Sequence, residues 1–168
     1  MLAWTACFAI RLIPFRPPNI EPLLATQMPF AKKYGAVWGY IFGFFSIFLF
    51  DIVSGKVGLW TVITATVYGF VGVGAAIFFQ KFKNTRFGFV KYAIIGTLIY
   101  DGLTGLTIGP LFFHQSFMES LIGQIPFTLN HLWGNIVLSI ILSPLIYKWV
   151  VTNENLNFKI VWRKRISI

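Results

Sequence analysis

The residues of this 168-residue chain that could do chemistry are ionisable side chains set within or beside long apolar runs. In a bilayer such groups are costly unless they are paired or wetted, so each one marks a candidate functional site. In a layout of about six membrane-crossing segments, they fall with uncharged polar residues in one half of the molecule. The members of this cluster are Arg11, Asn19, Glu21, Asp51, Asp101, His114, Gln115, Glu119, Gln124, Asn130, His131 and Asn135.

Two interpretations fit this cluster. In the first, Arg11 or Arg16 pairs with Glu21 or Asp51 and only holds helix ends together. In the second, which we favour for the cluster as a whole, the side chains form hydrogen bonds and charge pairs with a polar ligand. We expect this pocket to be lined by Asn19, Glu21, Asp51, Trp60, Asp101, Gln124, Asn130, His131 and Asn135.

Aromatic residues lie at similar predicted depths and could stack on a planar ring of the ligand, as in a vitamin or a nucleobase. The candidates are Trp60, Tyr100, Phe112 and Trp133, of which Trp60 is our choice for the stacking residue. Aromatic side chains at the ends of membrane helices also form interfacial belts, which is the alternative interpretation.

The residue types do not favour catalysis or a metal site. His114, His131, Asp101 and Glu119 match no compact ligand spacing. Gly55-Lys56 is followed by Val57 and lacks the upstream glycine of a phosphate-binding loop. We therefore expect neither an enzyme nor a cofactor, and any energy for active transport must come from an ion or from another subunit.

The elements that position these residues follow from composition. The chain is 57% hydrophobic and only 11% charged, with a mean hydropathy of +0.74, whereas soluble domains carry about a quarter charged residues. We predict one all-α integral membrane domain over residues 1–168, a bundle of about six helices. The single cysteine, Cys7, excludes an internal disulfide.

Four apolar segments are long enough to cross a bilayer as helices: 35–53, 58–80, 87–105 and 127–151. Two weaker segments are 2–13 and 20–31, with Asn19 as a possible helix cap for the second. The first weak segment is short for a span, so either it tilts into the bundle or the native start lies upstream. An amphipathic stretch over 115–125, before Pro126, is expected at the surface or as a lid.

Charge is distributed unevenly across this layout. Eleven of the fourteen Lys and Arg residues fall on one side, and four of the five acids fall on the other. The positive-inside rule then places both termini in the cytoplasm, and we expect a multi-pass protein of a prokaryotic plasma membrane. Orientation in the lipid bilayer explains the net charge of +9 better than binding to nucleic acid does.

Small residues predict close helix contacts. Gly35, Gly39 and Gly43 recur every four residues, which permits close helix approach. This stripe serves either internal packing, which we favour, or docking of a partner subunit. A possible internal repeat links Phe50-Asp51 with Tyr100-Asp101, because each pair precedes a hydroxyl residue and a glycine at the same spacing.

Several motifs together resemble the S component of an energy-coupling factor transporter. They are Arg11-Leu12-Ile13-Pro14, Pro18-Asn19-Ile20-Glu21-Pro22, Phe50-Asp51 with Ser54-Gly55-Lys56-Val57-Gly58-Leu59-Trp60, and Gly123-Gln124-Ile125-Pro126-Phe127-Thr128 continuing through Asn130-His131 to Gly134-Asn135. The resemblance covers most of the chain. It implies a subunit that captures a micronutrient and docks on a membrane coupling subunit driven by two cytoplasmic ATPases.

The resemblance also implies a small-xxx-small docking pattern in the first helix, which only Ala3 and Cys7 approximate here. The Gly35, Gly39 and Gly43 stripe is the other docking candidate. Rival functions are a stand-alone secondary transporter that uses Asp51 or Asp101 as its ion site, a membrane enzyme that uses His114, His131 and Glu119, and a purely structural subunit. The substrate does not follow from the resemblance.

Overall fold

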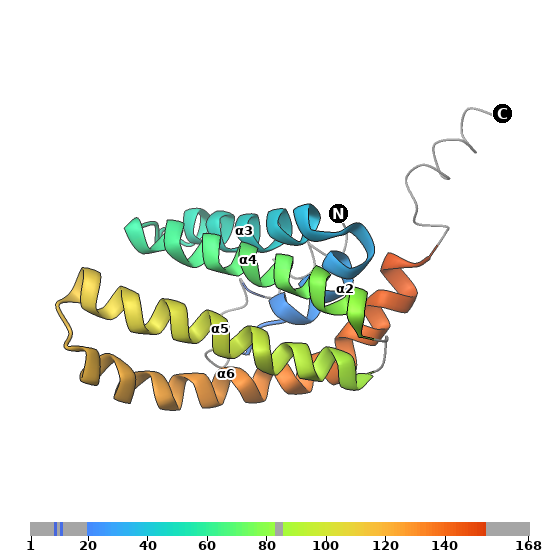
Figure 1. Cartoon of the computed structure of the whole chain (residues 1–168). Helices are drawn as coiled ribbons and strands as arrows, with labels where there is room; N and C mark the ends of the chain where they lie inside the picture. Colours follow the sequence, from blue (N-terminus) through green and yellow to red (C-terminus); the bar gives the residue numbers. More distant parts are fainter. Residues whose placement is uncertain (1–8, 10, 12–19, 83–85, 154–168) are drawn as a thin grey trace.

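The computed structural model describes Ala9, Arg11, residues 20–82 and residues 86–153. In these residues every regular element is helical, which confirms the all-α prediction for this part of the chain (Figure 1). The elements are α2 (Leu23–Tyr34), α3 (Ala36–Val53), α4 (Leu59–Lys81), α5 (Arg86–Phe113), α6 (Phe117–Ile146) and the π-helix η1 (Tyr147–Val151).

The helices form two antiparallel pairs, α3 with α4 and α5 with α6, with α2 between them (Figure 1). Helix α2 contacts every other described helix. Leu23, Leu24, Ala25 and Met28 are accordingly almost fully buried. Gly35 makes the corner between α2 and α3, with a φ of 91° that favours glycine. The predicted segment 20–31 thus corresponds to α2, the central helix of the described bundle.

Four helical stretches are long and apolar enough to cross a membrane: α3, α4, α5 and α6 with η1. Helix α2 has 12 residues, about 18 Å of helix, so it is too short to cross about 30 Å of hydrocarbon. The predicted segment 2–13 lies outside the described residues except for Ala9 and Arg11. The described part therefore contains four candidate spans.

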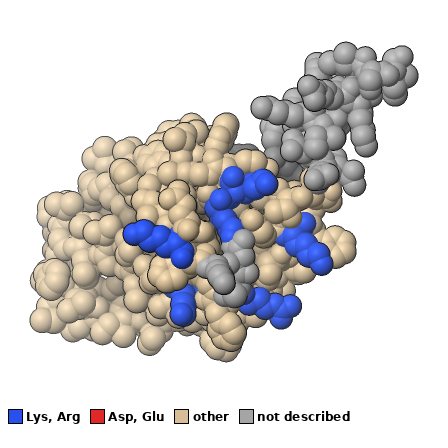
Figure 2. Space-filling view, turned by 45° about the vertical axis from the view of Figure 1, so that its right-hand side comes forward, with Lys and Arg blue, Asp and Glu red and all other residues tan. Residues whose placement is uncertain are grey.

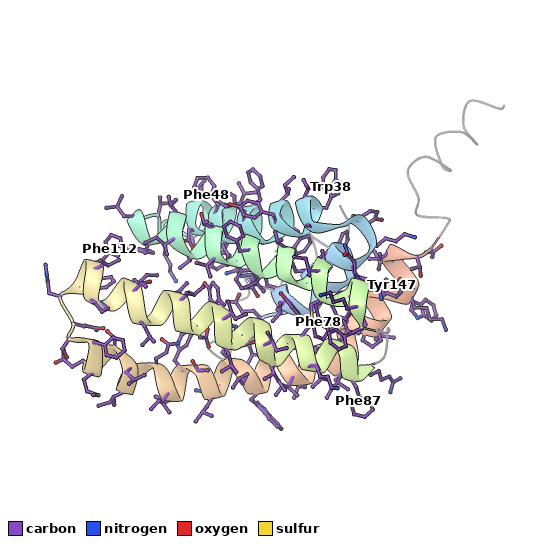
Figure 3. The ribbon with its side chains drawn as sticks, in the orientation of Figure 1. Trp38, Phe48, Phe78, Phe87, Phe112 and Tyr147 are labelled. Atoms are coloured by element: carbon purple, nitrogen blue, oxygen red, sulfur yellow. The ribbon has the colours of Figure 1, made fainter. Side chains whose placement is uncertain are left out.

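The exterior of the long helices is more apolar than that of a soluble protein. Large apolar residues point outward, such as Trp38 at 59% exposure and Phe87 at 77% (Figure 3). Polar residues such as Gln27, Thr61 and Ser143 are fully buried. An apolar exterior over long helices, with polar groups paired inside, indicates a membrane-embedded bundle.

The last two predicted segments need correction. Helix α5 runs through Gly105 and Pro110 to Phe113 instead of ending near residue 105. The predicted surface stretch 115–125 is not separate, because α6 begins at Phe117 and continues through Pro126. Ser116 starts this helix with a capping box, in which its Oγ accepts from the Glu119 N–H and Glu119 Oε2 accepts from the Ser116 N–H. Pro126 removes one backbone N–H from this helix, and membrane helices tolerate proline where neighbouring groups satisfy the freed carbonyl.

Basic residues gather at one end of the bundle. Six of the eight described Lys and Arg residues belong to it: Lys32, Lys33, Lys81, Arg86, Lys91 and Lys148. Figure 2 shows this basic end, on which no Asp or Glu is visible. The described acids, Glu21, Asp51, Asp101 and Glu119, all lie elsewhere. The predicted charge asymmetry is therefore present in the described part of the fold.

Candidate functional site

The centre of the candidate site is a buried pair of titratable side chains between α5 and α6. Asp101 Oδ1 lies 2.8 Å from His131 Nδ1. Asp101 is 1% exposed and His131 is 7% exposed. The second carboxylate oxygen, Asp101 Oδ2, has no hydrogen-bond partner. A buried carboxylate with one free acceptor is costly in an apolar bundle, which makes this pair the strongest candidate for function.

One turn away, the same two helices form a second polar contact. Asn135 Nδ2 donates to Thr97 Oγ1 at 2.8 Å, and both residues are 1% exposed. Asn135 Oδ1 has no hydrogen-bond partner. Thr97 and Asp101, like His131 and Asn135, are four residues apart, so each pair lies on one face of its helix. The two contacts are therefore successive rungs between antiparallel helices.

These rungs belong to a longer polar stripe along α6. Its members recur every three or four residues and are Gln124, Thr128, His131, Asn135, Ser139 and Ser143. Gln124 Nε2 donates to Thr128 Oγ1 at 3.0 Å. At the other end, Ser143 Oγ donates to the Ala25 carbonyl at 2.8 Å. Thr97, Thr128, Ser139 and Ser143 were not among the predicted site residues, although their helical spacing is visible in the chain.

Arg11 and Glu21 form a second charge pair, in which Arg11 is buried and Glu21 is partly buried. Arg11 Nε lies 2.9 Å from Glu21 Oε2, and Arg11 Nη1 donates to the Ser46 carbonyl at 2.8 Å. The guanidinium also stacks over Phe50, 4.0 Å from the ring centroid. Arg11 is only 7% exposed. The Arg11–Glu21 pair is one of the pairings expected if the cluster only holds helix ends together. The hydrogen bond to Ser46 attaches Arg11 to α3.

Tyr100 packs beside the Asp101–His131 pair. Its ring packs edge-on against His131, with 6.1 Å between centroids, and against Tyr68 at 4.8 Å. Tyr100 of α5 therefore contacts aromatic rings of α4 and α6 beside the Asp101–His131 pair.

Asp51 occupies the end of α3 and ties it to the start of α4. Its Oδ2 accepts from Thr61 Oγ1 at 2.6 Å, and Thr61 Oγ1 accepts from the Gly58 N–H at 3.1 Å. Thr61 is fully buried and Asp51 is partly buried. This contact orients the carboxylate of Asp51 at the junction between α3 and α4.

Of the nine expected pocket residues, Asp101 pairs with His131, and Asn135 lies one turn further along α6. Glu21 pairs with Arg11, and Asp51 accepts from Thr61. Gln124 lies further along α6 against Gly105. Trp60 packs on Phe113, with 5.7 Å between ring centroids. Asn130 is exposed, because it is out of phase with the polar stripe on α6. Asn19 lies outside the described residues.

The glycine stripe is used inside the bundle. A Cβ on Gly39 would lie 2.6 Å from the Gly72 carbonyl oxygen, and one on Gly43 would lie 2.5 Å from that of Tyr68. Gln27, which was not among the predicted site residues, donates from Nε2 to the Gly39 and Tyr68 carbonyls at 3.0 Å each. Gly39 and Gly43 therefore pack against α4 and α2, and Gly35 forms the turn between α2 and α3. Of the other docking candidates, Ala3 and Cys7 lie outside the described residues.

The chemistry available at the site is hydrogen bonding and charge pairing. Across residues 20–82 and 86–153, with Ala9 and Arg11, no three His, Cys, Asp or Glu side chains are close enough to hold a metal ion. The site offers carboxylates, one imidazole, one amide and aromatic rings in an apolar bundle. Comparisons with protein-family models, with curated proteins and with solved structures found no match to this chain.

Proposed function

We propose that this chain is the substrate-capture subunit of an energy-coupling factor type uptake transporter, with a small polar micronutrient such as a vitamin as its substrate. One observation carries the proposal: the buried Asp101–His131 pair keeps an unpaired carboxylate oxygen in the middle of helices long enough to cross a membrane. An intramembrane ionisable group is a functional-site hypothesis by default.

The basic end supports an orientation. Lys32, Lys33, Lys81, Arg86, Lys91 and Lys148 gather there, and the positive-inside rule assigns such an end to the cytoplasm. Both termini are then cytoplasmic in a multi-pass protein of a prokaryotic plasma membrane. The Asp51 end of α3 opens toward the outside, where a capture subunit meets its substrate.

The partners in this proposal are a membrane coupling subunit and two cytoplasmic ATPases. They are needed because Gly55-Lys56-Val57 does not form a phosphate-binding loop. Since Gly39 and Gly43 are covered by α4 and α2, the docking contact with the coupling subunit involves another surface. Ala3 and Cys7 remain our candidates for it.

The test is purification of the tagged chain from its native host in mild detergent, with mass spectrometry of everything that accompanies it. Two ATPase chains and another membrane protein are the expected companions, and a retained small molecule would identify the cargo. A solitary chain in several detergents would contradict the proposal.

One observation favours a second function, ion-coupled secondary transport. The Asp101–His131 pair holds two titratable groups 2.8 Å apart inside the bundle, and proton relays in transporters use such groups. This alternative predicts substrate uptake by proteoliposomes that contain the purified chain alone and an imposed proton gradient. The capture-subunit proposal predicts no sustained uptake in the same vesicles.

A further inference from the structure

The unpaired atoms of the described bundle share one hydrogen-bonding character. Among the described residues, four buried side-chain atoms lack a hydrogen-bond partner: Arg11 Nε, Gln27 Oε1, Asp101 Oδ2 and Asn135 Oδ1. Arg11 Nε lies 2.9 Å from Glu21 Oε2 and is therefore paired by charge. The other three are oxygens of a carboxylate or an amide, which accept hydrogen bonds. What these three positions lack is therefore a donor.

Two of these acceptors lie on successive rungs between α5 and α6. Asp101 uses its Oδ1 for His131, and Asn135 uses its Nδ2 for Thr97. Asp101 and Asn135 are each 1% exposed. In each rung one atom of the side chain is paired and the other is left over. Since the rungs are one helical turn apart, they are separated by about 6 Å along the helix axes, so one small molecule can reach both oxygens.

The proton of the Asp101–His131 pair belongs on His131, because imidazole is a stronger base than carboxylate. His131 Nδ1 then donates to Asp101 Oδ1, and Asp101 Oδ2 remains an acceptor. A buried acceptor without a donor is costly, and native proteins pair nearly all such atoms with protein, water or ligand groups. Two free acceptors on neighbouring rungs therefore indicate a bound molecule that supplies the donors.

On the basis of the proposed function, we propose that the substrate carries two hydrogen-bond donors, N–H or O–H groups on separate atoms, which donate to Asp101 Oδ2 and Asn135 Oδ1. The selection acts on the number of donors and applies to neutral and charged molecules alike. Tyr100 and Phe127 border the site with apolar surface, because both rings pack edge-on against His131 at 6.1 and 6.0 Å between centroids. A molecule that presents only acceptors there would leave both oxygens unpaired.

The experiment titrates the purified full chain in detergent with three neutral rings of similar shape: resorcinol with two hydroxyl donors, 3-fluorophenol with one and 1,3-difluorobenzene with none. Binding is measured as the shift in Tm over a series of millimolar probe concentrations. We expect each donor to tighten binding, by about fivefold for the amide oxygen of Asn135 and by about tenfold for the carboxylate of Asp101.

Nonspecific partition into the micelle favours the fluorinated rings and would give the opposite order. A site that holds only water would give no shift. The opposite order, equal binding of the three probes, or no shift with any of them overturns the proposal.

The variant Asn135→Leu removes one of the two acceptors, so the second hydroxyl should no longer contribute. Resorcinol should then lose about fivefold in affinity and bind as 3-fluorophenol does. Gln80→Leu is the matched control, because Gln80 is an exposed amide on α4, and this variant should keep the advantage of resorcinol. An unchanged advantage in Asn135→Leu would contradict the assignment of Asn135. If Asn135→Leu does not fold, the order of the three probes on the unmodified chain still decides.

This titration requires no ATPase, so it separates the two proposals. A chain that binds more tightly with each added donor but purifies alone would refute the capture-subunit function and keep the donor-selective site. A chain that purifies with ATPases but does not respond to the number of donors would do the reverse.

Discussion

The contact between α3 and α4, here called the glycine seam, differs in kind from the contact between α5 and α6, here called the polar seam. Between α3 and α4 the backbones touch, because Gly39 lies directly against Gly72 and no side chain separates them. Between α5 and α6 the helices are held by polar rungs, Thr97–Asn135 and Asp101–His131. A glycine contact stabilises by close packing alone. A rung of titratable groups costs desolvation, so under the proposed function we attribute the Asp101–His131 rung to ligand binding.

The largest expected effect comes from breaking the polar seam. His131→Leu removes the only described partner of Asp101 and leaves a buried carboxylate unpaired, which should cost about 3 kcal/mol of unfolding free energy. The measurement is the unfolding midpoint in detergent. Adding Asp101→Asn to the variant should recover much of the loss, since the charge is then removed. A single variant as stable as the unmodified chain would show that His131 does not stabilise Asp101.

The glycine seam should respond almost as strongly to a single methyl group. Gly72→Ala places a Cβ against the Gly39 carbonyl and Gln27 Nε2, and such overpacking costs about 2 kcal/mol. Thermal unfolding in the same detergent is the measurement. The control is Gly102→Ala on α5, where nothing lies within 4 Å of an added Cβ. Similar losses in both variants would mean that the α3–α4 contact is not specifically tight.

Asp51 tests whether the site extends beyond the polar seam. Asp51→Ala removes one hydrogen bond with Thr61, so stability should fall by only about 1 kcal/mol. Retention of the co-purifying small molecule should fall by about tenfold, because a charged contact to the ligand is lost. Mass spectrometry of the retained molecule, normalised to membrane abundance, distinguishes the two effects. Equal losses of ligand and abundance would indicate a purely structural role.

The smallest effect distinguishes two asparagines on one helix. Asn135→Ala breaks the hydrogen bond to Thr97, which in membrane bundles is worth about 0.6 kcal/mol. Asn130→Ala, on the exposed face of α6, should leave the unfolding midpoint unchanged. Chemical unfolding of both variants in parallel resolves a difference of this size. A larger loss in Asn130→Ala would mean that the polar stripe does not follow the buried face of α6.

Much of the polar cluster was predictable because ionisable residues in apolar runs must gather away from lipid. Asp101, His131 and Asn135 were expected together, and the structure places them on adjacent rungs. The continuity of α6 was not predictable in the same way, since Pro126 and the polar residues before it are typical of a helix boundary. Asn130 lies exposed beside the polar stripe, because residues adjacent in sequence point to different faces of a helix.

The sequence by itself determined the apolar segments, the helical class and the gathering of basic residues at one end, because these depend on composition and period along the chain. Only the tertiary structure decided which side chains contact one another across the helices. Three features depend on how helices far apart in sequence are rotated against one another. They are the packing of Gly39 inside the bundle, the bridge that Gln27 makes between α3 and α4, and the choice of the Asp101 oxygen that stays unpaired. Helix rotation is set by the sum of many weak packing contacts, and no local pattern records that sum.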